Sequence, residues 1–108
     1  MGGFGQKKKE NKGSSKKLLK LSENDLKVKS INHHIKGNLD EAEKGYIAFQ
    51  KNGFYDPDIF SNYALLCEGR GEHEKAIKLY KKCISNSPNH IFSKINLSFL
   101  YYKLNNLK

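Results

Sequence analysis

The chain has 108 residues, of which 37% are hydrophobic and 29% are charged, and its formal net charge is +9. This length allows one domain and a tail at most, and the low hydrophobic share is typical of a thin repeat stack with a tail. No apolar run has the length of a membrane span or the form of a secretory signal, so we expect a cytoplasmic protein.

The positive charge is concentrated at the amino end. Residues 1–20 contain seven lysines and one glutamate, whereas the other 88 residues contain 13 basic and 10 acidic side chains. Residues 1–21 have too few apolar side chains to offset the entropy of ordering, so we expect a disordered tail. Two interpretations stay open: a solubilising segment, or an arm that binds nucleic acid or an anionic membrane surface. Lysine without interleaved arginine or aromatic residues favours the first.

The first predicted helical pair covers residues 22–56. Ser22 is a good N-cap residue, and acidic residues follow it in the first turn, where the helix dipole favours them. We expect helices over about 22–36 and 38–52, separated by a glycine. Asn38 would cap the second helix, because a glutamate three residues later completes the spacing of a capping box.

The second predicted pair covers residues 57–90. Asp56 followed by a proline predicts the start of a helix that ends near Gly71, a residue type that tolerates positive φ. A second helix over 73–86 precedes Pro88, which cannot continue it. The inward face of that second helix repeats at i, i+4 and i+7: Ala76, Tyr80 and Cys83.

Residues 91–108 predict one more helix, from about His90 to Leu104, that is apolar on nearly every side. One side would pack on the preceding helix. A repeat stack normally ends in a polar capping helix, and we favour the view that a longer repeat protein continues here. Otherwise a partner, or a second copy through self-association, would cover the exposed open-end face, which we predict to consist of Leu97, Leu100, Tyr101 and Leu104.

These segments share one register. Seven positions of the second pair alternate small and large residues across two helices: Ala64, Cys67, Gly71, Ala76, Tyr80, Cys83 and Pro88. Thirty-four residues earlier the register gives Gly37, Ala42 and Tyr46, and 34 residues later it gives Ser98, Tyr101 and Asn105. Alanine-sized residues let two helices approach closely, and an aromatic ring fills the gap beside them.

This pattern resembles the tetratricopeptide repeat, whose length is 34 residues. The resemblance implies an all-α fold of antiparallel helix hairpins, an α-solenoid of about two and a half repeats. Its units would be a divergent first repeat (22–56), a second repeat (57–90) and the first helix of a third (91–108).

No catalytic or metal-binding motif accompanies these repeats. Cys67 and Cys83 form no CxxC pair, and the histidines lack metal-ligand spacing. There is no phosphate-binding loop and no pairing of nucleophile and base. On the first helix, we expect His33 to pack inward and His34 to be exposed. We therefore expect buried thiols, no cofactor and no enzymatic activity.

The resemblance also implies a binding groove, because the first helices of successive tetratricopeptide repeats line a concave surface. The groove residues in register are Lys27, Ile31, Asn62, Leu65, Asn96 and Phe99. Asn62 and Asn96 recur one repeat apart, and amides that both donate and accept could hold the backbone of an extended peptide. This arrangement is similar to the asparagine ladder of tetratricopeptide-linked glycosyltransferases. Alternatively, the two amides make hydrogen bonds within the stack.

Three functional interpretations follow. The leading one is a non-enzymatic interaction module that binds a peptide or a partner helix in the groove. The alternative, by family analogy, is the N-terminal docking arm of a larger glycosyltransferase or sulfotransferase. The third makes the lysine-rich tail the active part, as a tether to nucleic acid or to an anionic membrane.

Overall fold

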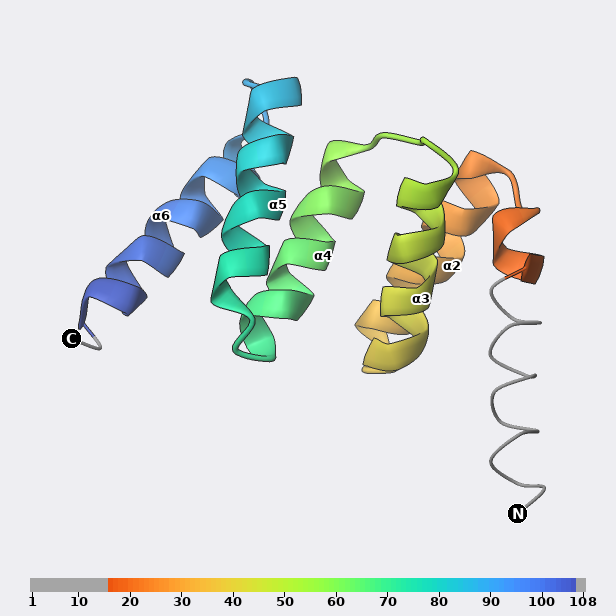
Figure 1. The fold of residues 1–108 in the computed structure, drawn as a ribbon, viewed down its shortest axis with the longest axis horizontal. Helices are drawn as coiled ribbons and strands as arrows, with labels where there is room; N and C mark the ends of the chain where they lie inside the picture. The colour runs from red at the N-terminus through yellow and green to blue at the C-terminus, as the bar shows by residue number, and fades with distance from the viewer. Residues whose placement is uncertain (1–15, 107–108) are drawn as a thin grey trace, which may run out of the picture. The chain divides into compact units, whose positions relative to one another are not determined.

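The computed structural model describes residues 16–106, which form α-helices joined by turns (Figure 1). The helices are α2 (Glu23–Ile35), α3 (Leu39–Lys51), α4 (Pro57–Gly69), α5 (His73–Asn86) and α6 (Ile91–Asn106). The predicted all-α fold of helix hairpins is confirmed. The chain divides into two compact units, Met1–Phe54 and Tyr55–Lys108. No helix in the described part of the chain is long and apolar enough to cross a membrane.

The helix boundaries repeat at the spacing that the sequence predicts. Helices α2 and α4 each have 13 residues, and both of their ends are displaced by the same 34 positions. Helices α3 and α5 start at the same displacement, as do α4 and α6. In both hairpins a glycine with positive φ follows the first helix, Gly37 at 81° and Gly71 at 80°. A left-handed backbone there favours glycine over every other residue.

The two first helices of the hairpins begin with side-chain caps. Ser22 Oγ accepts a hydrogen bond from Asp25 N at 3.1 Å. Asp56 Oδ1 accepts from the backbone N–H groups of Asp58 and Ile59 at 2.9 and 3.4 Å, as expected for N-caps.

The predicted capping box at Asn38 is wrong. Asn38 starts α3 without a side-chain cap, at a ψ of 71°, whereas ψ at Ser22 is 161°. The tight turn that follows Gly37 takes the Asn38 backbone out of the extended conformation that a capping side chain requires.

The segment before α2 is more ordered than the sequence analysis predicts. Residues 16–19 are helical, and the Leu18 side chain is buried. The predicted disordered tail, residues 1–21, is therefore too long at its carboxyl end, because one leucine gives the segment an apolar anchor. The rest of that prediction, residues 1–15, lies outside the described residues.

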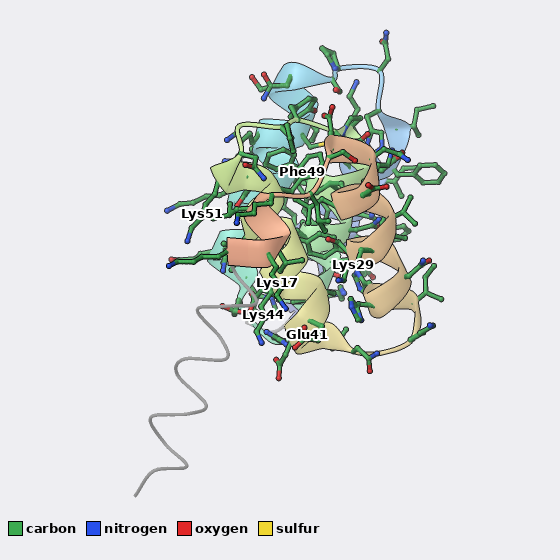
Figure 2. All side chains as sticks on the ribbon, turned by 90° about the vertical axis from the view of Figure 1, so that its right-hand side faces the viewer. Lys17, Lys29, Glu41, Lys44, Phe49 and Lys51 are labelled. Atoms are coloured by element: carbon green, nitrogen blue, oxygen red, sulfur yellow. The ribbon has the colours of Figure 1, made fainter. Side chains whose placement is uncertain are left out.

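The first unit is an antiparallel hairpin of α2 and α3 around a small core. Its fully buried side chains include Leu26, Ala42, Tyr46 and Phe49. Figure 2 shows Phe49 lying among the helices while the exposed Lys51, half a turn further along α3, extends away from them.

The two helices of this hairpin approach closely at Ser30 and Gly45. A Cβ atom built on Gly45 would lie 2.8 Å from Ser30 Cβ and would overlap Ser30 Oγ. The buried Ser30 hydroxyl donates a hydrogen bond to the Leu26 carbonyl at 2.7 Å, so its polarity is satisfied within α2. Gly45 is thus the residue that lets the two backbones approach.

The second unit contains α4, α5 and α6. Helix α6 packs on α5 and also contacts α4 (Figure 1). Helix α4 is buried over most of its circumference. Both cysteines are fully buried, as expected, and neither forms a disulfide with a described residue.

The predicted exposed open-end face on α6 is partly wrong. Leu100 is completely buried and Leu97 is 9% exposed, while Leu104 is half-buried and only Tyr101 is exposed. The buried positions repeat at three- and four-residue intervals together with Ser93, so they form the stripe that packs on the rest of the unit.

We predict that Gly45→Ala destabilises the first unit by about 1–3 kcal/mol, since the added methyl group must displace Ser30 or separate the helices. Urea unfolding followed by circular dichroism measures the change. Gly69→Ala is the matched control: nothing lies within 4 Å of its new Cβ, so a neutral or slightly stabilising effect is expected. Equal effects of the two substitutions would contradict the close approach.

Candidate functional site

Two polar contacts tie α4 to α6. His90 Nε2 lies 3.0 Å from Asp58 Oδ1, at the start of both helices. Lys103 Nζ lies 3.4 Å from Glu68 Oε2, near the end of both helices. Because the starts of the two helices are in contact and so are their ends, α4 and α6 run in the same direction. One side of each helix therefore contributes to a shared surface.

Four of the predicted groove residues lie between these two contacts, and we call them the α4–α6 face: Asn62, Leu65, Asn96 and Phe99. Leu65 and Phe99 are 38% and 62% exposed, while the two asparagines are half-buried. On each helix the asparagine precedes the apolar residue by three positions, so the pair shares one side of the helix.

The surroundings of the two asparagine amides test whether they bond within the stack or stay available to a ligand. Among residues 16–106, neither the Asn62 nor the Asn96 side chain makes a hydrogen bond with another residue. The structure therefore gives no support to a role for these amides in hydrogen bonds within the stack. Both retain donors and an acceptor for a ligand.

The other two predicted groove residues, Lys27 and Ile31, lie on α2 in the first unit. Both are half-buried, and they are four positions apart on one side of the helix. A groove that continues from α2 to α4 stays a prediction.

The expectation for His34 is wrong. Its side chain is not free on the surface, because His34 Nδ1 lies 2.6 Å from Tyr46 Oη on α3. The two rings meet edge to face at 5.8 Å. Partial burial lowers the pKa of His34 from its ordinary value of 6.5, and burial raises the pKa of Tyr46. His34 and Tyr46 are 12 positions apart and lie on the two helices that the turn at Gly37 joins.

The equivalent positions in the second unit are Glu68 and Tyr80, and they behave differently. Tyr80 Oη and Glu68 Oε1 are both buried, and neither has a hydrogen-bond partner among the described residues. Burial, followed by the negative charge of Glu68, raises the pKa of Tyr80. Replacing the histidine by a glutamate thus leaves the tyrosine hydroxyl without the bond that its counterpart makes.

His90 is the centre of a polar cluster at the start of α6. Its Nδ1 lies 3.1 Å from Ser93 Oγ and 3.6 Å from Cys83 Sγ. A thiol, an imidazole and the Asp58 carboxylate therefore lie in sequence, as in a nucleophile–base–acid arrangement. The thiol is fully buried and also donates to the Pro57 carbonyl at 3.4 Å, so it is held inside the core. The cluster acts as a structural cap of α6.

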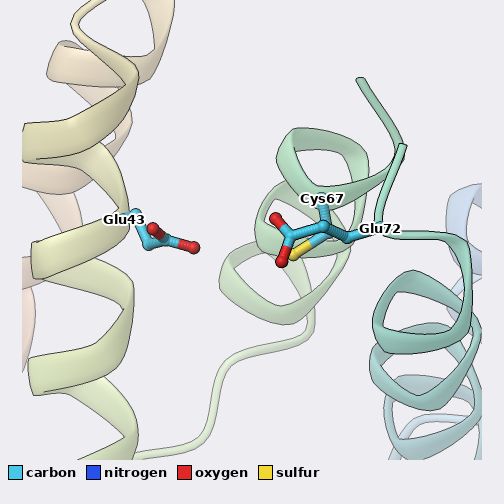
Figure 3. A group of neighbouring side chains, drawn as sticks. All are labelled: Glu43, Cys67 and Glu72. Atoms are coloured by element: carbon cyan, nitrogen blue, oxygen red, sulfur yellow. The ribbon is translucent and has the colours of Figure 1, made fainter. Parts of the chain in front are cut away.

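Neither unit brings together enough potential metal ligands among its described residues to form a metal site. Within either unit, no three His, Cys, Asp or Glu side chains of the described residues lie close enough to share an ion. Figure 3 draws Cys67 and Glu72 of the second unit together with Glu43 of α3, which belongs to the first unit. Cys67 and Glu72 alone are two ligands, fewer than protein zinc sites use.

No protein-family model, no curated protein and no solved structure matches this chain.

We predict opposite responses of the two equivalent tyrosines to loss of the hydroxyl. Tyr46→Phe removes the bond to His34 and should destabilise the chain by about 1 kcal/mol. Tyr80→Phe removes a buried hydroxyl that lacks a partner, so it should be neutral or stabilising. Urea unfolding of both variants provides the comparison. A loss at Tyr80 as large as that at Tyr46 would contradict the assigned environments.

A pH dependence of stability follows from His34. Its folded-state pKa is below the unfolded value of 6.5, so the unfolded chain binds more protons as pH falls through that value. This contribution to stability is present above 6.5 and is lost toward the lower folded-state pKa. His34→Gln should flatten the dependence of the unfolding midpoint on pH between about pH 5 and 7.5. An unchanged slope in His34→Gln would exclude this origin.

Proposed function

We propose that this chain is a non-enzymatic protein-interaction module of the tetratricopeptide type, in which the α4–α6 face binds an extended peptide segment. The observation that carries the proposal is the pair of unengaged amides, Asn62 and Asn96, placed in register on two parallel helices. The 34-residue displacement of helix ends and of the positive-φ glycines supports the assignment to that repeat type.

The chemistry of the face fits a peptide backbone with apolar side chains. Each amide can donate to a peptide carbonyl and accept from a peptide N–H, which needs no particular side-chain sequence. Leu65 and Phe99 beside the amides offer apolar contact area that is partly exposed in the free chain. Affinity would therefore come from the backbone, and preference would come from the apolar side chains of the ligand.

The ligand search uses the full chain and a phage library of short random peptides, and a selected peptide is then synthesised with a fluorescent label. We predict that Asn62→Ala combined with Asn96→Ala weakens its binding about 10-fold or more, since two hydrogen bonds of about 1 kcal/mol each are lost. Fluorescence anisotropy measures the dissociation constant.

The matched control is Asn105→Ala, an exposed asparagine on α6 that lies outside the α4–α6 face. It should leave the affinity unchanged, and circular dichroism should show equal helicity in all variants. Undiminished binding by the double variant would remove the asparagines, and with them the α4–α6 face, from the proposed function.

A further inference from the structure

Helix α6 carries a second surface, on the side opposite its buried stripe. Five large side chains there are 44–69% exposed: Ile91, Phe92, Ile95, Phe99 and Tyr102. Ser93, Leu97 and Leu100 occupy the other side of the helix and are buried. At 100° per residue these sets form two separate stripes, so α6 is apolar on both sides but covered on only one among the described residues.

The exposed stripe contains an open, shallow hollow of about 470 Å³. Its walls are Ile95, Ser98, Phe99 and Tyr102, with Lys94 at the rim. The spacing of the four wall residues is i, i+3, i+4 and i+7, which is the arrangement of a hole that receives a side chain from a packed helix. The small Ser98 side chain gives the hollow its depth.

Two positions of this surface, Ser98 and Lys94, correspond to positions that are buried in both hairpins, whereas Phe99 corresponds to Leu65, which is 38% exposed. Counting back by the 34-residue displacement, Ser98 corresponds to Ala64 and to Ser30. Both are buried, and Ser30 lies against Gly45 of α3. The geometry of the first hairpin therefore predicts what fits α6: an antiparallel helix with a small residue opposite Ser98.

The charge of Lys94 favours an acidic residue at one position of the docked helix. It stands where the earlier helices have Leu26 and Phe60, which are both buried. A helix seated over Ser98 would bring Lys94 into the contact, where an unpaired ammonium group is costly. In the first hairpin Ser30 lies against Gly45 of an antiparallel helix. The residue four positions before Ser30, Leu26, is then expected opposite the residue four positions after Gly45, Phe49, and both are buried. The partner helix therefore needs a carboxylate four residues after its small residue.

We propose that the outer face of α6 docks an amphipathic helix of a partner protein with a small residue followed, four positions later, by Asp or Glu. A second copy that pairs through its own α6 does not meet this requirement, because α6 carries Lys94 and Lys103 and no acidic residue, and each copy has a net charge of +9. The proposal is independent of the peptide site on the α4–α6 face, with which it shares only Phe99.

The probe is a synthetic, end-capped and fluorescently labelled peptide with the sequence of residues 38–53, into which Phe49→Glu is introduced. It keeps the small residue of α3 and adds the carboxylate one turn later. Two comparison peptides carry Phe49→Lys, or Phe49→Glu together with Gly45→Leu. At about 50 mM salt we expect the Phe49→Glu peptide to bind at least about 10-fold more tightly than either comparison peptide. At about 0.5 M salt the difference in affinity between the Phe49→Glu and Phe49→Lys peptides should be smaller, because salt screens the charges.

Ser98→Leu in the full chain fills the hollow and should weaken binding of the Phe49→Glu peptide at least about 10-fold. Ser85→Leu is the matched control, since it adds the same side chain at an exposed position of α5. Lys94→Glu should reverse the preference between the Phe49→Glu and Phe49→Lys peptides. The peptide site can be read separately, because Asn62→Ala with Asn96→Ala should leave this helix binding unchanged.

Two results would overturn the proposal. Equal binding by wild type and Ser98→Leu would mean that the acidic peptide is attracted by lysines elsewhere on this basic chain. A concentration-dependent dimer in sedimentation velocity that Ser98→Leu abolishes would assign the surface to a second copy. A monomeric wild type that binds the Phe49→Glu peptide through Ser98 and Lys94 would support it.

Discussion

The close approach of paired helices at small side chains is the constraint on which the other contacts depend. Where Ser30 meets Gly45, the glycine has no Cβ atom, so only the small serine side chain lies between the two backbones. The helices are then near enough for the Tyr46 hydroxyl of α3 to reach His34 near the end of α2. Tyr46 and Tyr80 are both fully buried, and Tyr46 directly follows Gly45 in α3. The core of each unit is thin, so a single misplaced methyl group cannot be absorbed by rearrangement elsewhere.

The polar groups of the second unit act at the ends of its helices. Asp58, His90 and Ser93 bring the start of α6 against the start of α4, and Glu68 with Lys103 does the same near their ends. Partly exposed polar contacts of this kind contribute little free energy, but they fix direction and spacing. Burial of Leu97 and Leu100 supplies the attraction, and the polar contacts decide that the two helices run in parallel. The α4–α6 face is a consequence of that alignment.

Helix positions could be predicted from the sequence because their signals are local. A glycine that needs positive φ, an N-cap and a proline each act within a few residues, and the boundaries at Gly37, Ser22 and Asp56 are where these signals place them. The covered side of α6 could not be predicted in the same way. A helix that is apolar all round has no preferred face until its neighbours are known, so the sequence does not show that Leu97 and Leu100 belong to the buried side.

For the candidate site, the sequence predicts only which residues occupy equivalent positions in successive repeats. Counting by 34 identified Asn62 and Asn96, but not the contacts of His90 with Asp58 or of His34 with Tyr46, which depend on how the turns direct each side chain.

The position of the two cysteines has a practical consequence. Cys67 and Cys83 both lie in the second unit, both are fully buried, and the first unit contains none. A thiol reagent can therefore reach them only when α4 and α5 open, and its rate measures local opening of that hairpin rather than unfolding of the whole chain. The native sequence thus contains a kinetic reporter that distinguishes the dynamics of one helical hairpin from those of the other without any added label.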